Sequence, residues 1–129
     1  MTAKRMSAVV LLAMGVLTAP AALGHPATER YIPIGKSPGL SGKLTYMGKV
    51  GSVDARGRSV SGESWSAAVT ERTRIWLDRS KLRETNTVGS LDDLKAGRLV
   101  EVKYLGREAG QRRGAAEWIK VEIPAPASR

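Results

Sequence analysis

The chain has 129 residues, with 21 basic and 12 acidic side chains, a formal net charge of +9 and no cysteine. The absence of cysteine excludes disulfides and a lipid-anchored start, so a folded domain must be held together by its core alone. A positive balance of this size attracts nucleic acid, acidic polysaccharide, anionic lipid headgroups or an acidic protein, although it also serves to keep a small domain soluble.

Residues 1–24 have the order of a signal peptide. Two basic residues precede an apolar run over 8–17, and small residues follow up to Gly24. The run is shorter than the ~20 residues that cross a bilayer, so we expect no transmembrane segment and a periplasmic or secreted protein. Cleavage after Gly24 is preferred to cleavage after Ala21, and it leaves about 105 residues, the size of one domain.

Residues 25–42 form a segment rich in proline and glycine, with three of each. This composition excludes a helix and a central strand. We expect an extended arm, with Tyr31, Ile32 and Ile34 pinned to the surface of the domain that follows.

Five strands are expected between residues 43 and 123, because β-branched and aromatic residues alternate there with polar ones. The strands occupy 43–54, 58–71, 72–78, 98–106 and 115–123. Glycines inside the first two indicate bulges or breaks. The fourth and fifth strands are expected to alternate between inward residues (Val100, Val102, Tyr104, Ile119, Val121, Ile123) and outward ones (Glu101, Lys103, Trp118, Lys120, Glu122). A tail over 124–129 follows.

One short helix is expected between strands three and four. Ser90 is placed to cap the amide of residue 93, Asp92 and Asp93 occupy the first turn, and Gly97 suits a left-handed stop. Adjacent helical side chains diverge by ~100°, so the two acids are interpreted as structural and not as a metal or acid-base pair. Three strands, a short helix and two strands predict a mainly β fold, an OB-like five-stranded Greek-key barrel.

Four stretches, 48–54, 73–77, 91–106 and 115–123, resemble a group of small exported bacterial domains with OB-like barrels. The resemblance implies the fold and no function. The arrangement of these stretches is also similar to that of periplasmic copper and silver chaperones, small OB barrels whose metal ligands are a histidine and a Trp-x-x-Met-x-Met cluster.

This chain departs from the chaperone pattern at the metal ligands. Trp65 is followed by Ser-Ala-Ala-Val, Met47 is the only methionine after the leader, and no histidine lies within the barrel. His25, the only histidine, would become the N-terminus after cleavage at Gly24, where its amine and imidazole can chelate Cu(II). Known copper sites of that kind add a second histidine, so His25 stays a secondary metal candidate and no cofactor is expected.

Two tryptophans are the main binding candidates. Trp76 and Trp118 fall on the polar phase of strands three and five, which are neighbours in an OB barrel. With Arg74 and Lys120 they form either an exposed aromatic and basic patch, suited to sugars, bases or a protein, or a satellite core covered by the arm. Trp65 is expected in the core.

The loop between strands four and five carries Arg107, Arg112 and Arg113. It is either a further part of the binding surface or a solvated loop. The chain has no cysteine, no histidine in the domain and no Gly-x-Ser-x-Gly elbow, so no enzyme is expected.

The expected function is that of a non-enzymatic binding module of the bacterial envelope, which recognises an anionic or acidic protein or polysaccharide. Export makes nucleic acid the least available partner. Two alternatives remain: a metal-handling or metal-stress accessory protein that uses His25 or Met47, and an envelope structural subunit whose arm docks on a neighbour.

Overall fold

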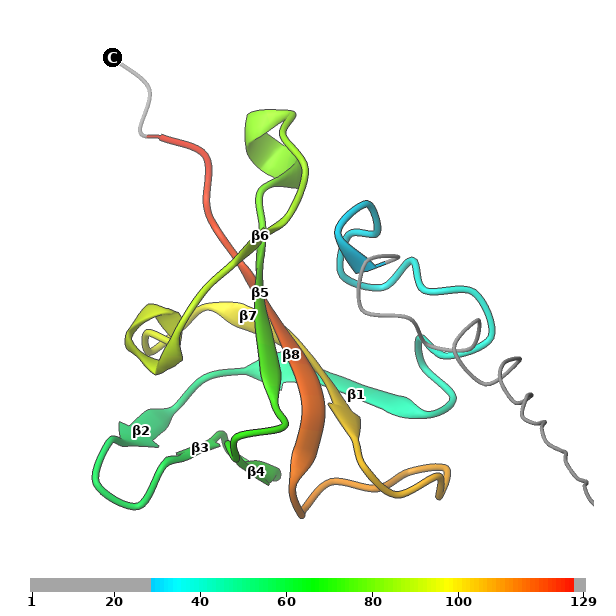
Figure 1. Ribbon diagram of the computed structural model, residues 1–129, viewed down its shortest axis with the longest axis vertical. Coiled ribbons are helices and arrows are strands. Elements are labelled where there is room, and N and C mark those ends of the chain that lie inside the picture. Colours follow the sequence, from blue (N-terminus) through cyan, green and yellow to red (C-terminus); the bar gives the residue numbers. More distant parts are fainter. Residues whose placement is uncertain (1–28, 127–129) are drawn as a thin grey trace, which may run out of the picture.

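The computed structural model describes residues 29–126, which form a mainly β fold of two sheets (Figure 1). The strand order is β1-β7-β8-β5-β6 in the larger sheet and β2-β3-β4 in the smaller one. Neither sheet closes into a barrel. The expected leader, its cleavage sites and His25 lie outside the described residues.

Within residues 29–126, eight strands and two 3-10 helices make up the two sheets and their connections. The strands are β1 Thr45–Lys49, β2 Ser52–Asp54, β3 Ser59–Ser61, β4 Ser66–Ala68, β5 Arg74–Asp78, β6 Thr87–Val88, β7 Leu99–Tyr104 and β8 Ala116–Glu122. The 3-10 helices are η3 Ser80–Leu82 and η4 Leu91–Asp93. No helix within residues 29–126 is long and apolar enough to cross a membrane.

The first two expected strands are each broken near a glycine, so that they form β1 with β2 and β3 with β4. At the second break the Trp65 indole donates to the carbonyl of Lys49 at 3.1 Å. A Cβ on Gly62 would collide with both of these groups. Glycine at this position therefore allows the indole to cross the gap between the sheets.

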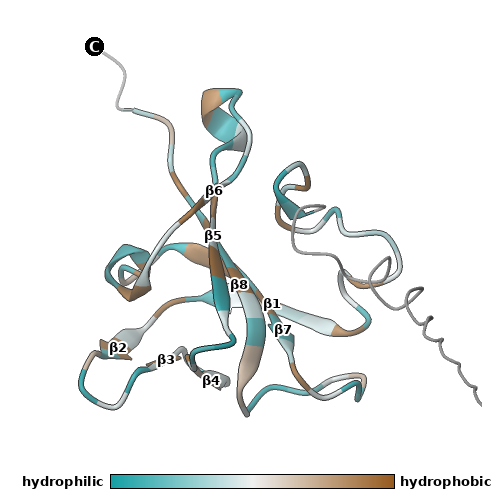
Figure 2. Cartoon of the chain, viewed as in Figure 1, coloured by the Kyte–Doolittle hydropathy of each residue, from teal (hydrophilic) through white to brown (hydrophobic). Residues whose placement is uncertain are grey.

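The centre of the larger sheet is the parallel pair of β5 and β8, flanked on the other side of β8 by antiparallel β7. Hydrophobic and hydrophilic residues alternate along β8 (Figure 2). The apolar phase faces the main core, where Ile75, Val102 and Ile119 are buried with Trp65. The expected inward positions of Val100, Val102, Tyr104, Ile119 and Val121 and the core position of Trp65 are confirmed, whereas Ile123 follows the end of β8 and is only half-buried.

The opposite face of this sheet is also buried, which corrects the prediction of an outward phase. Glu101 and Lys120 are both 0% exposed, and Lys103 and Trp118 are buried as well. Residues 29–42 lie over this face in a series of turns, with positive φ at Gly35, Gly39 and Gly42, and not as an extended arm. Ile32 and Ile34 are half-buried against the sheet, whereas Tyr31 is 69% exposed.

The short helix expected near residue 91 is the 3-10 turn η4. The Asp93 carboxylate accepts the backbone N–H of Ser90 at 2.8 Å, and Asp92 is exposed. Gly97 has the left-handed φ of 89°, but it follows η4 by several residues and its N–H donates to the carbonyl of Val50. Asp93 thus has a structural role in closing this turn.

Candidate functional site

The four residues of the predicted patch lie on one face of β5 and β8, as expected. Arg74 is in register with Trp118, and Trp76 is in register with Lys120. The interpretation as an exposed patch is wrong for three of them: Trp76 is 2% exposed, Trp118 4% and Lys120 0%, and only Arg74 is open to solvent. The second interpretation, a satellite core under the arm, describes this face.

The cations of this face stack on its indoles. Lys120 Nζ lies 4.7 Å from the ring centroid of Trp118, and the guanidinium carbons of Arg30 and Arg74 lie 6.0 and 5.8 Å from that of Trp76. The indole Nε1–H of Trp76 is buried without a hydrogen-bond partner. The two arginines therefore stabilise Trp76 through its ring and not through its N–H.

A buried ion pair joins the arm to β8. Lys120 Nζ lies 2.6 Å from Glu29 Oε1 and donates to Ser37 Oγ at 2.9 Å, while Ser37 Oγ donates to Glu29 Oε1 at 3.1 Å. The two charged side chains are 0% and 5% exposed. Each charge is thus matched by an opposite charge and a hydroxyl, which is what a buried pair requires.

Three more buried polar side chains hold the arm. The Glu101 carboxylate accepts from Gly35 N at 2.8 Å and from the hydroxyls of Ser41 and Thr45, both at 2.6 Å. Asp78 accepts the N–H of Ile34, and Asn86 donates to the carbonyls of Glu29 and Ile32. Since the main chain of the arm completes these contacts, the arm is an integral part of the fold.

The basic loop is separate from this face. Arg107, Arg112 and Arg113 are exposed, as expected for a loop. The Arg112 guanidinium lies 4.9 Å from the ring centroid of Tyr46, and the backbone carbonyl of Arg112 accepts the N–H of Ser66. The contacts of Arg112 therefore tie the loop to β1 and β4 and not to the four residues of the predicted patch.

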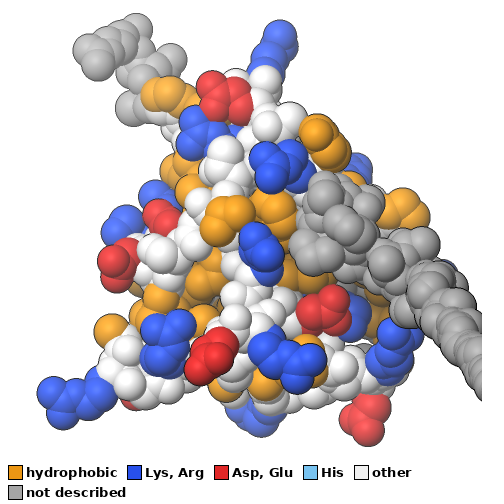
Figure 3. All heavy atoms as spheres, viewed as in Figure 1, with side chains coloured by type: hydrophobic (Ala, Val, Ile, Leu, Met, Phe, Trp, Pro, Cys, Tyr) orange, Lys and Arg blue, Asp and Glu red, His pale blue; other side chains and the backbone are white. Residues whose placement is uncertain are grey.

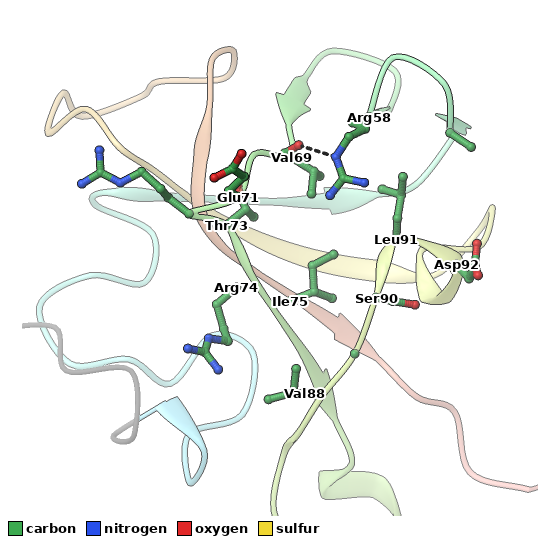
Figure 4. Close-up of a pocket in the computed structure, with 13 residues that line it drawn as sticks. Arg58, Val69, Glu71, Thr73, Arg74, Ile75, Val88, Ser90, Leu91 and Asp92 are labelled. Carbon is green, nitrogen blue, oxygen red and sulfur yellow. Dashed lines mark hydrogen bonds between the residues drawn. The ribbon is translucent and has the colours of Figure 1, made fainter.

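A groove of about 610 Å³ opens where β5 and the smaller sheet part. In Figure 4 Arg58 and Arg74 lie on opposite sides of Ile75, and Leu91 and Ser90 line a further side. The full lining comprises Ala55, Arg58, Val69, Glu71, Arg72, Thr73, Arg74, Ile75, Val88, Gly89, Ser90, Leu91 and Asp92.

The guanidinium groups of the groove make few contacts within the described residues, among them the stacking of Arg74 on Trp76. Within residues 29–126 none of Arg58, Arg72 and Arg74 forms an ion pair. Arg58 uses only its Nε, which donates to the carbonyl of Val69 at 3.3 Å. The groove thus holds three guanidinium groups that form no ion pair within residues 29–126, and two acidic side chains, Glu71 and Asp92, also line it.

The surface of the described residues is basic. Residues 29–126 hold 18 basic and 12 acidic side chains, and burial removes two lysines and three acids from contact with solvent. Sixteen basic side chains then stand against nine acidic ones. Lys and Arg side chains are spread over the face of the molecule drawn in Figure 3, with fewer acidic ones among them.

Arg58 and Arg72 were not among the residues predicted from the sequence. The sequence does indicate that Arg72 and Arg74 belong together, because they alternate with Thr73 at the start of the third expected strand and so lie on the same face. It gives no such indication for Arg58, since this residue ends a turn that is distant from them in the chain. It joins the groove only through the arrangement of the sheets.

Residues 29–126 hold no group of three His, Cys, Asp or Glu side chains close enough together to bind a metal ion. Comparison of the chain with protein-family models, with curated proteins and with solved structures finds no match.

Proposed function

We propose that the protein is an exported, non-enzymatic binding module that holds an anionic or acidic partner in the groove beside β5. One observation supports this most directly: Arg58, Arg72 and Arg74 line a single groove and pair with no carboxylate within residues 29–126. A guanidinium keeps its charge at physiological pH and presents a planar fork of donors that matches carboxylate, sulfate and phosphate groups.

The proposed fold around the groove is an interrupted OB-like Greek key. Its support is the chain order, in which β5 lies parallel to β8 with β7 on the far side of β8, and η4 lies between β5 and β7. OB folds bind ligands over their second and third strands and in adjoining loops. Arg58 stands at the start of the second expected strand and Arg74 at the start of the third.

Surface charge supports the same proposal. An excess of exposed cations raises the local concentration of anions and speeds their association, and the effect weakens as ionic strength rises. A groove with a few unpaired guanidinium groups then converts general attraction into binding at one place.

Two triple variants test the proposal. R58Q/R72Q/R74Q changes the groove, and R107Q/R112Q/R113Q removes the same charge from the basic loop. Fluorescein-labelled polyglutamate and polygalacturonate are titrated with each purified protein and followed by anisotropy at low and at physiological salt. We expect the groove triple to weaken binding of at least one probe tenfold or more, and the loop triple to weaken it less than threefold.

Equal losses in the two triples would mean that the probes respond to net charge alone. This result would contradict the assignment of the groove as the binding site. A loss confined to the loop triple would move the site to residues 107–113.

A further inference from the structure

The groove contains apolar side chains between its arginines. Val69, Ile75, Val88 and Leu91 line it, and Val88 is 54% exposed although it belongs to a strand. The described lining includes no aromatic residue. Val69 and Ile75 are buried, so Val88 and the half-buried Leu91 provide most of the aliphatic surface that a ligand can contact. This surface lies beside charged side chains of both signs, Arg58, Arg72 and Arg74 with Glu71 and Asp92, and no flat ring is present on which to stack.

This lining discriminates between the classes of anionic partner. Nucleic-acid bases, and the flat faces of sugar rings, stack on aromatic side chains, and the tryptophans that could serve here are buried under the arm. An acidic polysaccharide could then contact the groove only through its carboxylate or sulfate groups. Leucine, isoleucine or valine side chains need only an aliphatic surface, which they bury from water at about 25 cal/mol per Å². The carboxylates of Asp and Glu match the guanidinium groups.

The positions of the arginines favour one pattern within such a chain. Arg58 and Arg74 lie on opposite sides of Ile75 (Figure 4). An aliphatic side chain set in the groove between Arg58 and Arg74, with an acidic residue before and after it, would place one carboxylate towards each guanidinium.

We infer that the partner held in the groove is an acidic protein segment in which aliphatic side chains alternate with Asp or Glu. This inference rests on the proposed function and narrows its partner from anionic polymers in general to a polypeptide of stated composition.

The test compares two labelled octapeptides of equal charge. One alternates Leu with Asp and Glu, and the other has Ser in place of each Leu. Both are titrated by anisotropy with the wild-type protein, the R58Q/R72Q/R74Q triple and V88S; T87S is the matched control, since Thr87 is the exposed neighbour of Val88 on β6 and does not line the groove. Polygalacturonate serves as the polysaccharide probe.

We expect the Leu peptide to bind about tenfold more tightly than the Ser peptide, since burial of apolar side chains contributes on the order of 1–2 kcal/mol. V88S should weaken the Leu peptide severalfold and leave the Ser peptide unchanged, and T87S should change neither. Circular dichroism of V88S checks that this exposed substitution leaves the fold intact.

The remaining outcomes separate the two proposals. Equal binding of both peptides, or groove-dependent binding of polygalacturonate alone, would overturn the acidic aliphatic segment and leave the groove as an anion site. Binding of every probe without any dependence on the groove arginines would overturn the proposed function as well.

Discussion

Lys120 Nζ lies 2.6 Å from Glu29 Oε1, and this buried ion pair connects the last strand of the domain to the first described residue of the arm. The pair closes over Trp118, whose ring centroid lies 4.7 Å from the same ammonium group. Lys120, which lies among the polar positions of β8 in the sequence, thus holds the arm against the larger sheet.

Breaking this pair should destabilise the protein strongly. K120M leaves the Glu29 carboxylate buried without its counter-charge, so we expect a loss of about 3–5 kcal/mol in the free energy of unfolding, measured by urea denaturation. K120M/E29Q should recover part of that loss. R79Q breaks the surface pair of Arg79 with Glu84 and should cost less than about 1 kcal/mol. Similar losses in K120M and R79Q would contradict the role assigned to the buried pair.

Periodicity was sufficient to place Trp76 and Lys120 on one face of neighbouring strands, because side chains alternate strictly along a strand. It did not predict that this face is covered. Charged residues at every second position of a strand, such as Lys120, are typical of a face that contacts water. The hydrogen-bond partner of Lys120, Ser37, lies 83 residues away in a segment without a periodic pattern. Such a contact depends on tertiary structure and leaves no local signal.

The groove escaped prediction for a related reason. Arg58 belongs to the connection of β2 and β3, Arg74 begins β5 and Leu91 begins η4. They line one groove because the two sheets do not close into the barrel that the strand order suggests. The strand pattern predicted where most of the strands lie and, through Gly62, where one of them breaks, but it did not predict β6 or η3. It could not predict the width of the gap that the break leaves.

The carboxylate of Glu101 should control the docking of the arm locally. E101Q keeps the shape of the side chain but removes its charge and one acceptor, while three donors still face it. We expect a loss of about 1–2 kcal/mol and faster hydrogen exchange at the amide of Gly35, measured by NMR. E108Q, in the exposed basic loop, is the control and should leave that amide unchanged. Unaltered exchange in E101Q would contradict the prediction.

Two tryptophan-to-phenylalanine variants should differ because only one indole N–H has an acceptor. Trp65 Nε1 donates to the Lys49 carbonyl at 3.1 Å, whereas Trp76 Nε1 is buried without a partner. Both substitutions remove a similar volume, so the hydrogen bond accounts for the difference. We expect W65F to lose about 1–2 kcal/mol more stability than W76F in urea denaturation. Equal losses would mean that ring volume outweighs the hydrogen bond.

Tyr104 should make stability depend on pH in the alkaline range. Burial, assisted by the nearby Tyr46, raises the pKa of Tyr104 to about 12, against an ordinary value of 10.0, and the phenol donates to the Ser66 carbonyl at 2.7 Å. The folded state therefore holds the phenolic proton to higher pH than the unfolded state does. This stabilisation is fully present below pH 10 and is lost as pH rises through about 12.

The measurement is the free energy of unfolding in urea at intervals from pH 9 to pH 12, for the wild type and for Y104F. Y104F has no phenolic proton at this position but shares every other titrating group, so the difference between the two curves isolates Tyr104. We expect the wild-type curve to fall more steeply, by up to about 1.4 kcal/mol per pH unit above pH 10. Parallel curves over this range would show that Tyr104 titrates alike in the folded and unfolded states.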